Sequence, residues 1–496
     1  MEDNSKDVST EVTGDQNVIS IEPQVKTEVS ESFEITPQSQ KHAGNQFATR
    51  SKSKEENTEK DNSIKTIVQP RIKPAPYRIS DLGISDEKEP AKQLVAKEKG
   101  DFYQSEDTPF NKRGFKYKPC RPNTFFKSNL YSATDVFPYE LRFSYFDRSQ
   151  GIIYGKDMNP ISTLNGWCSA RTNVCVREGK YYLEFNVENA NNDNDKAHVR
   201  LGFVRREASL EAPVGYDGYG YGLRDVHGHK VTLSRPSDFM KYCKDIDFPG
   251  FKTGDTIGML IELPSLKEHK AALEAATSLK LRRRNDSGED SYQKKRRKGK
   301  KVELEVDDNT PFRSYDNILR DEIPIKYKNS LFYEQYDYST TKRMELLLNP
   351  VTVFGEHAVV DNAKQSRESL NLYVIPNSRI KVFKNGIEIG TMFENLYSFL
   401  PTDVEEEDLG LFYNTTQHQN PKYRNTDDNS LGYYPMVSVF RMGIASINAG
   451  PDFKYPIKGV DNVLPLSERY EESIAEDWCW DIIDEVEAEY LDNLES

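Results

Sequence analysis

Short runs in which every second residue is apolar constrain the fold of this chain most. They occur in "YYLEFNVE", "HVRLGFV" and "DTIGMLIELP", each with polar residues or glycine between many of the apolar positions. Period-two alternation is typical of strands in antiparallel sheets that bury one face. The residues predicted to face a core are Leu183, Phe185, Val187, Val199, Leu201, Phe203, Ile257, Met259, Ile261 and Leu263.

Turn signals separate further strand-like runs. In "RIKVFKNGIEIGTMF" two such runs meet at Asn385-Gly386, the pair best able to adopt positive φ in a tight hairpin turn. "PMVSVFRMGIASINAG" supplies more strand. Many short strands joined by turns predict an all-β chain that folds as an antiparallel β-sandwich.

The composition changes along the chain and suggests its organisation. Residues 1–105 are polar with few aromatic residues, so we expect them to be disordered. The sandwich is predicted over 106–465, interrupted by a basic insertion at 265–310 and an acidic one at 401–430. Residues 466–496 have a helical pattern with many carboxylates.

Composition and motifs disfavour several classes of function. The net charge of −13 argues against general nucleic-acid affinity, and no apolar run approaches the roughly 18 residues of a membrane span. Five scattered cysteines fit neither a disulfide framework nor a zinc motif. "GYDGYGYG" matches no nucleotide-binding motif, and His227 and His229 are at most half of a metal site. We therefore expect a binding protein without cofactor or metal, not an enzyme.

Arg200 is the most informative charged residue. It lies between the apolar positions of "HVRLGFV" and therefore points away from the core. Gly202, the next residue on that side of the strand, is expected to leave open space beside it. A loop then leads from Pro213 to Arg224 and carries rings at Tyr216, Tyr219 and Tyr221. Two interpretations remain open: a solvated arginine, or a guanidinium among tyrosine rings that binds a carboxylate-rich peptide.

Several blocks together resemble a SPRY domain: "GKYYLEFNV", "VRLGFVRREASLEAPVGYDGYGYGLRDVHGHK", "GDTIGMLIELP", "SRIKVFKNGIEIG" and "SINAGPDFKYP". Their order, with "IPIKYKNSLFYEQYDY" and a final helix, is similar to the ASH-two-like (yeast Bre-two) subunit of COMPASS, the histone H3 lysine-4 methyltransferase complex. The resemblance covers residues 120–465 in blocks. It implies a SPRY-type β-sandwich and a non-catalytic nuclear scaffold that binds no S-adenosylmethionine, as in the shorter fungal members, which lack the zinc-finger and winged-helix region of animals.

The resemblance also implies a pocket for an acidic segment of the WD-repeat propeller subunit, which helps to position the catalytic SET-domain subunit. Carried over position by position, the pocket residues are Trp167, Arg200, Pro213, Tyr216 and Arg224, with Trp167 where the metazoan pattern has tyrosine. The alternative is a SPRY substrate adaptor for ubiquitin ligation. The scattered cysteines exclude the RING finger of such adaptors, and the final helix does not match a SOCS box.

The helix at 466–496 has an apolar stripe opposite a face of Glu and Asp. Two interpretations are open: the stripe packs back on its own sandwich, or it lies in a hydrophobic groove of another protein. The family resemblance implies the second, with a Dpy-thirty-type dimeric small subunit as partner. The stripe residues, with Ala475 at one end, are Trp478, Cys479, Ile482, Ile483, Val486 and Tyr490.

Two basic clusters in the first insertion have the spacing of a two-part nuclear import signal. The same residues could instead contact phosphates of nucleosomal DNA, or form a solvated loop. They are Arg282, Arg283, Arg284, Lys294, Lys295, Arg296, Arg297 and Lys298.

Overall fold

The computed structural model describes residues 73–83, 90–111, 115–192, 196–238, 240–241, 248–286, 322–336, 373–400, 427 and 429–495. Its elements in chain order are η1 (Ile79–Gly83), β1 (Lys92–Ala96), β2 (Phe102–Ser105), β3 (Phe115–Pro122), β4 (Tyr131–Ala133), β5 (Phe143–Arg148), β6 (Ile152–Tyr154), η2 (Lys156–Met158), β7 (Ile161–Thr163), β8 (Cys168–Thr172), β9 (Gly179–Asn189), β10 (His198–Val204), β11 (Gly220–Arg224), β12 (Lys230–Thr232), β13 (Arg235–Ser237), β14 (Met240–Lys241), β15 (Thr256–Leu263), α1 (Leu266–Asp286), β16 (Ile323–Tyr327), β17 (Ser330–Tyr336), β18 (Arg379–Lys384), β19 (Ile387–Glu394), β20 (Tyr434–Phe440), β21 (Ile444–Asn448), β22 (Leu464–Pro465) and α5 (Glu468–Glu495).

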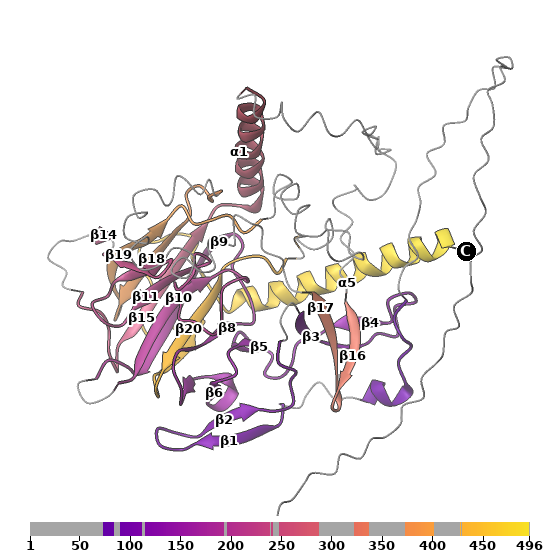
Figure 1. Ribbon diagram of the computed structural model, residues 1–496, viewed down its shortest axis with the longest axis horizontal. Helices are drawn as coiled ribbons and strands as arrows, with labels where there is room; N and C mark the ends of the chain where they lie inside the picture. Colours follow the sequence, from indigo (N-terminus) through magenta and orange to yellow (C-terminus); the bar gives the residue numbers. More distant parts are fainter. Residues whose placement is uncertain are drawn as a thin grey trace, which may run out of the picture. The chain divides into compact units, whose positions relative to one another are not determined.

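Two antiparallel sheets form the sandwich that carries the candidate pocket (Figure 1). In the described part of the chain, the larger sheet has the order β1-β2-β6-β7-β21-β9-β15-β18-β19-β14, with β22 parallel to β9. The smaller sheet has the order β13-β12-β11-β10-β20-β8-β5. The predicted all-β antiparallel fold is confirmed.

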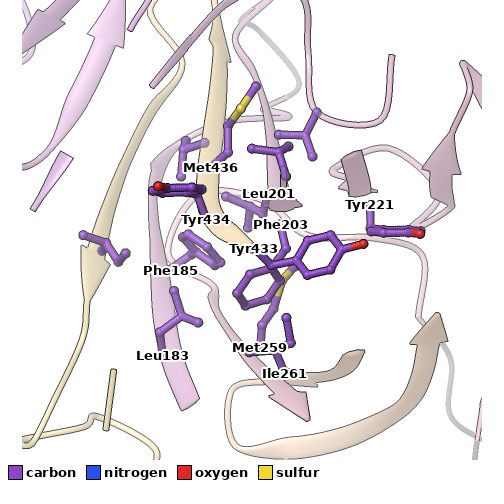
Figure 2. Packing of buried hydrophobic residues seen from close by; sticks show 14 of the residues in the cluster. Leu183, Phe185, Leu201, Phe203, Tyr221, Met259, Ile261, Tyr433, Tyr434 and Met436 are labelled. Atoms are coloured by element: carbon purple, nitrogen blue, oxygen red, sulfur yellow. The ribbon is translucent and has the colours of Figure 1, made fainter. Parts of the chain in front are cut away.

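The core lies between the inner faces of these sheets. Figure 2 shows Leu183 and Phe185 of the larger sheet packed near Leu201 and Phe203 of β10, and each of these side chains is fully buried. The other residues that the alternation assigned to the core are buried as well. The prediction holds because a strand with one apolar face can hide it only against a second such surface.

The predicted hairpin is also confirmed. β18 and β19 pair antiparallel around Asn385 and Gly386, whose φ angles are 50° and 82°. Asparagine and glycine tolerate these left-handed conformations better than other residues, so they fix the register of the two strands.

The predicted disorder of residues 1–105 is wrong for the end of that range. β1 and β2 form a hairpin that joins the larger sheet through β6, and Phe102 packs on Ile153 and Ile444. One buried aromatic residue in a polar stretch is a weak sequence signal, because β1 itself is largely exposed. Residues 1–72 lie outside the described part of the chain.

The first part of the 265–310 insertion is a helix and not a loop. The Ser265 hydroxyl and the Glu268 carboxylate cap the start of α1 reciprocally, and the sequence that follows is rich in the helix formers Ala, Leu, Lys and Glu. The Nε2 atom of buried His269 and the hydroxyl of Ser398 form a 2.8 Å hydrogen bond, and burial lowers the pKa of His269 to about 4. Residues 287–310 and 401–426 lie outside the described residues.

A third sheet, with the order β16-β17-β3-β4, carries α5 (Figure 1). The helix begins at Glu468, two residues after the predicted boundary, and contacts β4. No helix in the described ranges combines the length and the apolar character that crossing a membrane requires.

Candidate functional site

The strand register brings the two pocket arginines together. Arg200 on β10 pairs directly with Arg224 on β11 and, on its other side, with Ser438 on β20. Directly paired residues share one face of a sheet, and neighbours on each strand such as Leu201 and Leu223 fill the core. The arginines therefore stand side by side on the outer face of the smaller sheet.

An aromatic row borders the arginines on the same face. β20 pairs with β10 so that Phe440 lies opposite His198. β20 also pairs with β8, and one further step in that register places Trp167 beside Phe440. The rings of Trp167 and Phe440 are 5.3 Å apart, and the guanidinium of Arg200 lies 4.9 Å from the Trp167 ring centre. Trp167 and Arg200 are therefore in a cation–π contact, and the role of Trp167 in a peptide pocket stays a prediction.

Neither pocket arginine has an anionic partner among the described residues. No hydrogen bond or ion pair reaches the guanidinium group of Arg200 or Arg224 within that part of the chain. Burial and, to a lesser degree, nearby Arg224 lower the pKa of Arg200 to about 10, while Asp225 acts in the opposite direction.

Several other buried arginines of this fold are paired with a carboxylate, whereas buried Arg148 donates hydrogen bonds to backbone carbonyl groups instead. Arg171 binds Asp147 at 2.9 Å, and Arg142 binds Asp135 at 2.8 Å. Partly desolvated cations without a counter-ion are costly, so the pair of pocket arginines has the properties of an anion-binding site.

The glycine-tyrosine loop lies over the same outer face of the smaller sheet. The Ser438 hydroxyl accepts a hydrogen bond from the backbone of Val214 at 2.9 Å, which holds the loop over the sheet. Gly215 has φ of 79°, and a Cβ there would lie 2.3 Å from the carbonyl oxygen of Val231. Only glycine fits this contact, and the neighbouring Pro213 and Tyr216 are half-buried.

Two expectations about this loop are corrected. Gly202 leaves no open space, because a Cβ there would lie 2.0 Å from the carbonyl oxygen of Tyr221. Tyr219 and Tyr221 are buried in the core, so Tyr216 is the one ring of the three on the accessible side. Tyr221 lies on β11 two residues before the core residue Leu223 and therefore on the same side of the strand, and Tyr219 continues this alternation by two more residues.

Asp217 fastens the loop from inside. Its carboxylate accepts hydrogen bonds from the backbone N–H groups of Ser209 and Tyr219, at 2.9 Å and 3.0 Å. Burial raises the pKa of Asp217 to about 7, against the opposing effect of these two hydrogen bonds. The loop that borders the arginines is therefore held by a carboxylate whose charge is costly.

The C-terminal helix packs on its own chain through Tyr470 and Ile474 at its start and through several of its carboxylates. Asp477 binds Lys118 of β3 at 2.7 Å, and Asp481 accepts a hydrogen bond from the backbone of Ala133 in β4 at 3.0 Å. Glu485 accepts hydrogen bonds from three successive backbone N–H groups, those of residues 127–129. These contacts orient the helix on the β3–β4 hairpin.

The apolar stripe of α5 faces away from these contacts and is accessible. Ile482 is 52% exposed and Val486 51% exposed, although isolated side chains of this kind are usually buried. The helix returns to its own fold, but the stripe stays uncovered among the described residues, so the interpretation that the stripe packs on its own sandwich is wrong. Docking of the stripe in a groove of another protein stays a prediction. The other exposed stripe residues are Trp478, Cys479, Ile483 and Tyr490.

The remaining sequence candidates form no complete site among the described residues. Arg282 to Arg284 lie on α1, whose side chains are not described there, and Lys294 to Lys298 lie outside the described ranges. The rings of His227 and His229 are 5.5 Å apart, without a third His, Cys, Asp or Glu ligand in the described chain.

Sequence reasoning missed Phe440 beside the arginines and an acidic cluster that belongs to neither candidate site. Phe440 could have been found, because the alternation of "PMVSVF" places it on the same outward face as Ser438. An acidic cluster of Glu322, Asp481 and Asp484, with ligand oxygens within 4.8 Å of one another, had no signal in the sequence. Its members come from separate segments, and acidic clusters are common without an ion.

Comparison with known proteins finds relatives that are all named as components of COMPASS or the Set1 complex. No family model matches the chain. It is 34% identical to "COMPASS component cclA" of Colletotrichum higginsianum over 78% of this chain and 68% of the relative, and 34% identical to "Set1 complex component ash2" of Schizosaccharomyces pombe over 86% and 53%. It is 30% identical to "COMPASS component BRE2" of Saccharomyces cerevisiae over 78% of this chain and 89% of that relative.

The solved structures that are similar include a human SPRY domain. That match has a TM-score of 0.25 and 9% identity, and it covers 61% of this chain and 98% of the human chain. The chain spans about half of the length of the Schizosaccharomyces relative, at 53%, so the aligned regions and not whole proteins are compared.

Proposed function

Because the chain belongs to the family of COMPASS components that includes ash2 and BRE2, we propose that it is a non-catalytic scaffold subunit of a nuclear histone H3 lysine-4 methyltransferase complex. It binds one partner through the pocket at Arg200 and Arg224 and a second through the stripe on α5. The two contacts hold the catalytic SET-domain subunit in position without a reaction at this chain.

The unpaired arginines carry this proposal. Arg200 and Arg224 stand next to each other on a half-buried surface, with an aromatic ring behind one of them, and no carboxylate of the described residues forms an ion pair with either guanidinium. A peptide with Asp or Glu side chains supplies the missing negative charge, and each guanidinium can form two parallel hydrogen bonds with one carboxylate. An acidic segment of the WD-repeat propeller subunit is the ligand that the family resemblance implies.

The second contact uses the exposed stripe of α5. Its acidic face is already bound to the β3–β4 hairpin, so the helix is presented in one orientation before any partner arrives. A helix with anchors at i, i+3, i+4 and i+7 fits a hydrophobic groove such as the one between paired helices. We propose that a Dpy-thirty-type dimeric subunit covers Ile482, Ile483 and Val486.

The basic clusters of the 265–310 insertion fit a nuclear protein. We propose that Lys294 to Lys298, with the arginines at 282–284, act as an import signal or contact phosphates of nucleosomal DNA. Both roles need a dense positive charge in a chain that is otherwise acidic.

Replacing Arg200 by alanine tests the pocket. We expect the variant to bind a fluorescein-labelled Glu/Asp-rich peptide more weakly by about 2 to 4 kcal/mol, measured by anisotropy, because a partly buried charge pair is lost. Arg379→Ala is the matched control, since Arg379 is 44% exposed and pairs with Glu262 on the other sheet. Equal affinity in wild type and Arg200→Ala would refute the pocket assignment.

A methyltransferase assay of the isolated chain tests the non-catalytic role. The purified protein, incubated with histone H3 and a labelled methyl donor, should give no transfer above background. Robust turnover by the single chain contradicts the scaffold proposal.

A further inference from the structure

His229 extends the arginine row by one strand. β11 pairs with β12 so that Leu223 faces Lys230, and the backbone N–H of Arg224 donates a 3.0 Å hydrogen bond to the carbonyl oxygen of His229. The same register places His229 opposite Arg224, and directly paired residues share a face. Arg200, Arg224 and His229 thus form one row across three neighbouring strands.

The imidazole of His229 has no strong partner in the described chain. Its Nε2 lies 3.7 Å from a carboxylate oxygen of Asp238, which is beyond hydrogen-bonding distance, and the Asp238 side chain is 89% exposed. An ion pair of this kind contributes little in water. The Nδ1 atom is buried and makes no hydrogen bond. The side chain is 30% exposed, so a ligand on this face can reach it.

The length of the row sets what such a ligand must supply. Neighbouring strands lie about 4.8 Å apart, so His229 is roughly 10 Å from Arg200 measured across the sheet. One carboxylate cannot contact both ends of the row. A second acidic side chain of the same ligand therefore lies over Arg224 and His229 when the first lies over Arg200.

We propose that His229 is a further contact residue of the acidic-segment pocket. This inference rests on the proposed function of the pocket. Around the imidazole lie Arg224 on β11, His227 in the β11–β12 turn and Asp238 after β13. Arginines and the carboxylates of the ligand keep their charge between about pH 6 and 8, whereas imidazole side chains change theirs in this range.

The experiment measures the affinity of the full chain for a fluorescein-labelled Glu/Asp-rich peptide at about pH 6 and about pH 7.5. A peptide with Gln and Asn in place of the acids is the ligand control. We compare wild type with His229→Gln, His227→Gln and Arg200→Ala. His227 is the matched control, because it is an exposed histidine two residues away that does not belong to the row.

We expect wild type and His227→Gln to bind about fivefold more tightly at the lower pH, and His229→Gln to change less than about twofold. If His229→Gln keeps the full pH dependence, or wild type has none, the role of His229 is refuted. If Arg200→Ala binds as tightly as wild type at both pH values, the proposed function of the pocket fails instead.

Discussion

The substitution Val486→Glu separates docking by α5 from the stability of the fold. Val486 is 51% exposed and stands in the middle of the stripe, between Ile482 and Tyr490 at i−4 and i+4. Since the side chain makes no core contact, we expect the free energy of unfolding to change by no more than about 0.5 kcal/mol. Any loss of binding then comes from the interface and not from misfolding.

The expected loss of affinity can be worked from the exposure. A partner that buries the remaining half of the valine gains about 1 kcal/mol, which the variant loses. The glutamate adds a carboxylate that would be buried without a partner, at a further cost of several kcal/mol. A total of about 4 kcal/mol corresponds to a roughly thousandfold increase in Kd.

Calorimetric titration with the small dimeric subunit measures this change, and a thermal melt by circular dichroism checks the fold. Ile387→Glu is the matched control, because Ile387 is 62% exposed at the start of β19 and undergoes the same chemical change away from the helix. We expect it to bind like wild type. A Val486→Glu protein that retains normal affinity would refute the assignment of the stripe.

Three further outcomes follow from the fold and the pocket. Gly202→Ala should lower the urea midpoint by an amount equivalent to about 2 to 4 kcal/mol, because its Cβ would lie 2.0 Å from the carbonyl oxygen of Tyr221; an unchanged midpoint contradicts the close approach of β10 and β11. Burial raises the pKa of Asp217 to about 7 from 3.8, so the folded state binds this proton more tightly, and its contribution to stability is lost as the pH rises from about 4 to 7. Asp217→Asn should flatten that part of the stability profile in chemical denaturation, and an identical profile in the variant argues against a buried, titrating Asp217. Replacing Lys294 to Lys298 by alanines should reduce nuclear accumulation of a fluorescent fusion without a change in its melting temperature; full nuclear retention rejects an import role for these residues.

The sequence predicted the sandwich core well, because alternation is a local property. Leu183, Leu201 and Met259 each follow a period of two within a few residues, and the physical reason, burial of one strand face, needs no knowledge of the partner strand. The pocket depends on which strands are neighbours. Trp167 and Phe440 meet only because β8 and β20 pair across a long stretch of chain, so pattern alone left Arg200 open to two interpretations.

The helix could be predicted as an element but not in its orientation. A stripe of apolar residues opposite carboxylates suggests that the apolar side faces the protein, and α5 does the reverse. Glu485 accepts hydrogen bonds from backbone N–H groups, which every residue type except proline has, so the side chains of residues 127–129 give no signal of the contact in the sequence. The helix capped by Ser265 was missed because its many polar residues suggested a surface loop, although Ala, Leu, Lys and Glu in the same segment favour a helix.

Two separable binding sites on one scaffold are the central claim, and a mixture of three components tests it most directly. Light scattering after size exclusion measures the mass of the wild-type chain, the Arg200→Ala chain and the Val486→Glu chain, each with the small dimeric subunit and the WD-repeat subunit. We expect wild type to form the complex of all three proteins, Arg200→Ala to lose only the WD-repeat subunit, and Val486→Glu to lose only the small subunit. A variant that loses both partners, or neither, contradicts the claim that the two sites act independently.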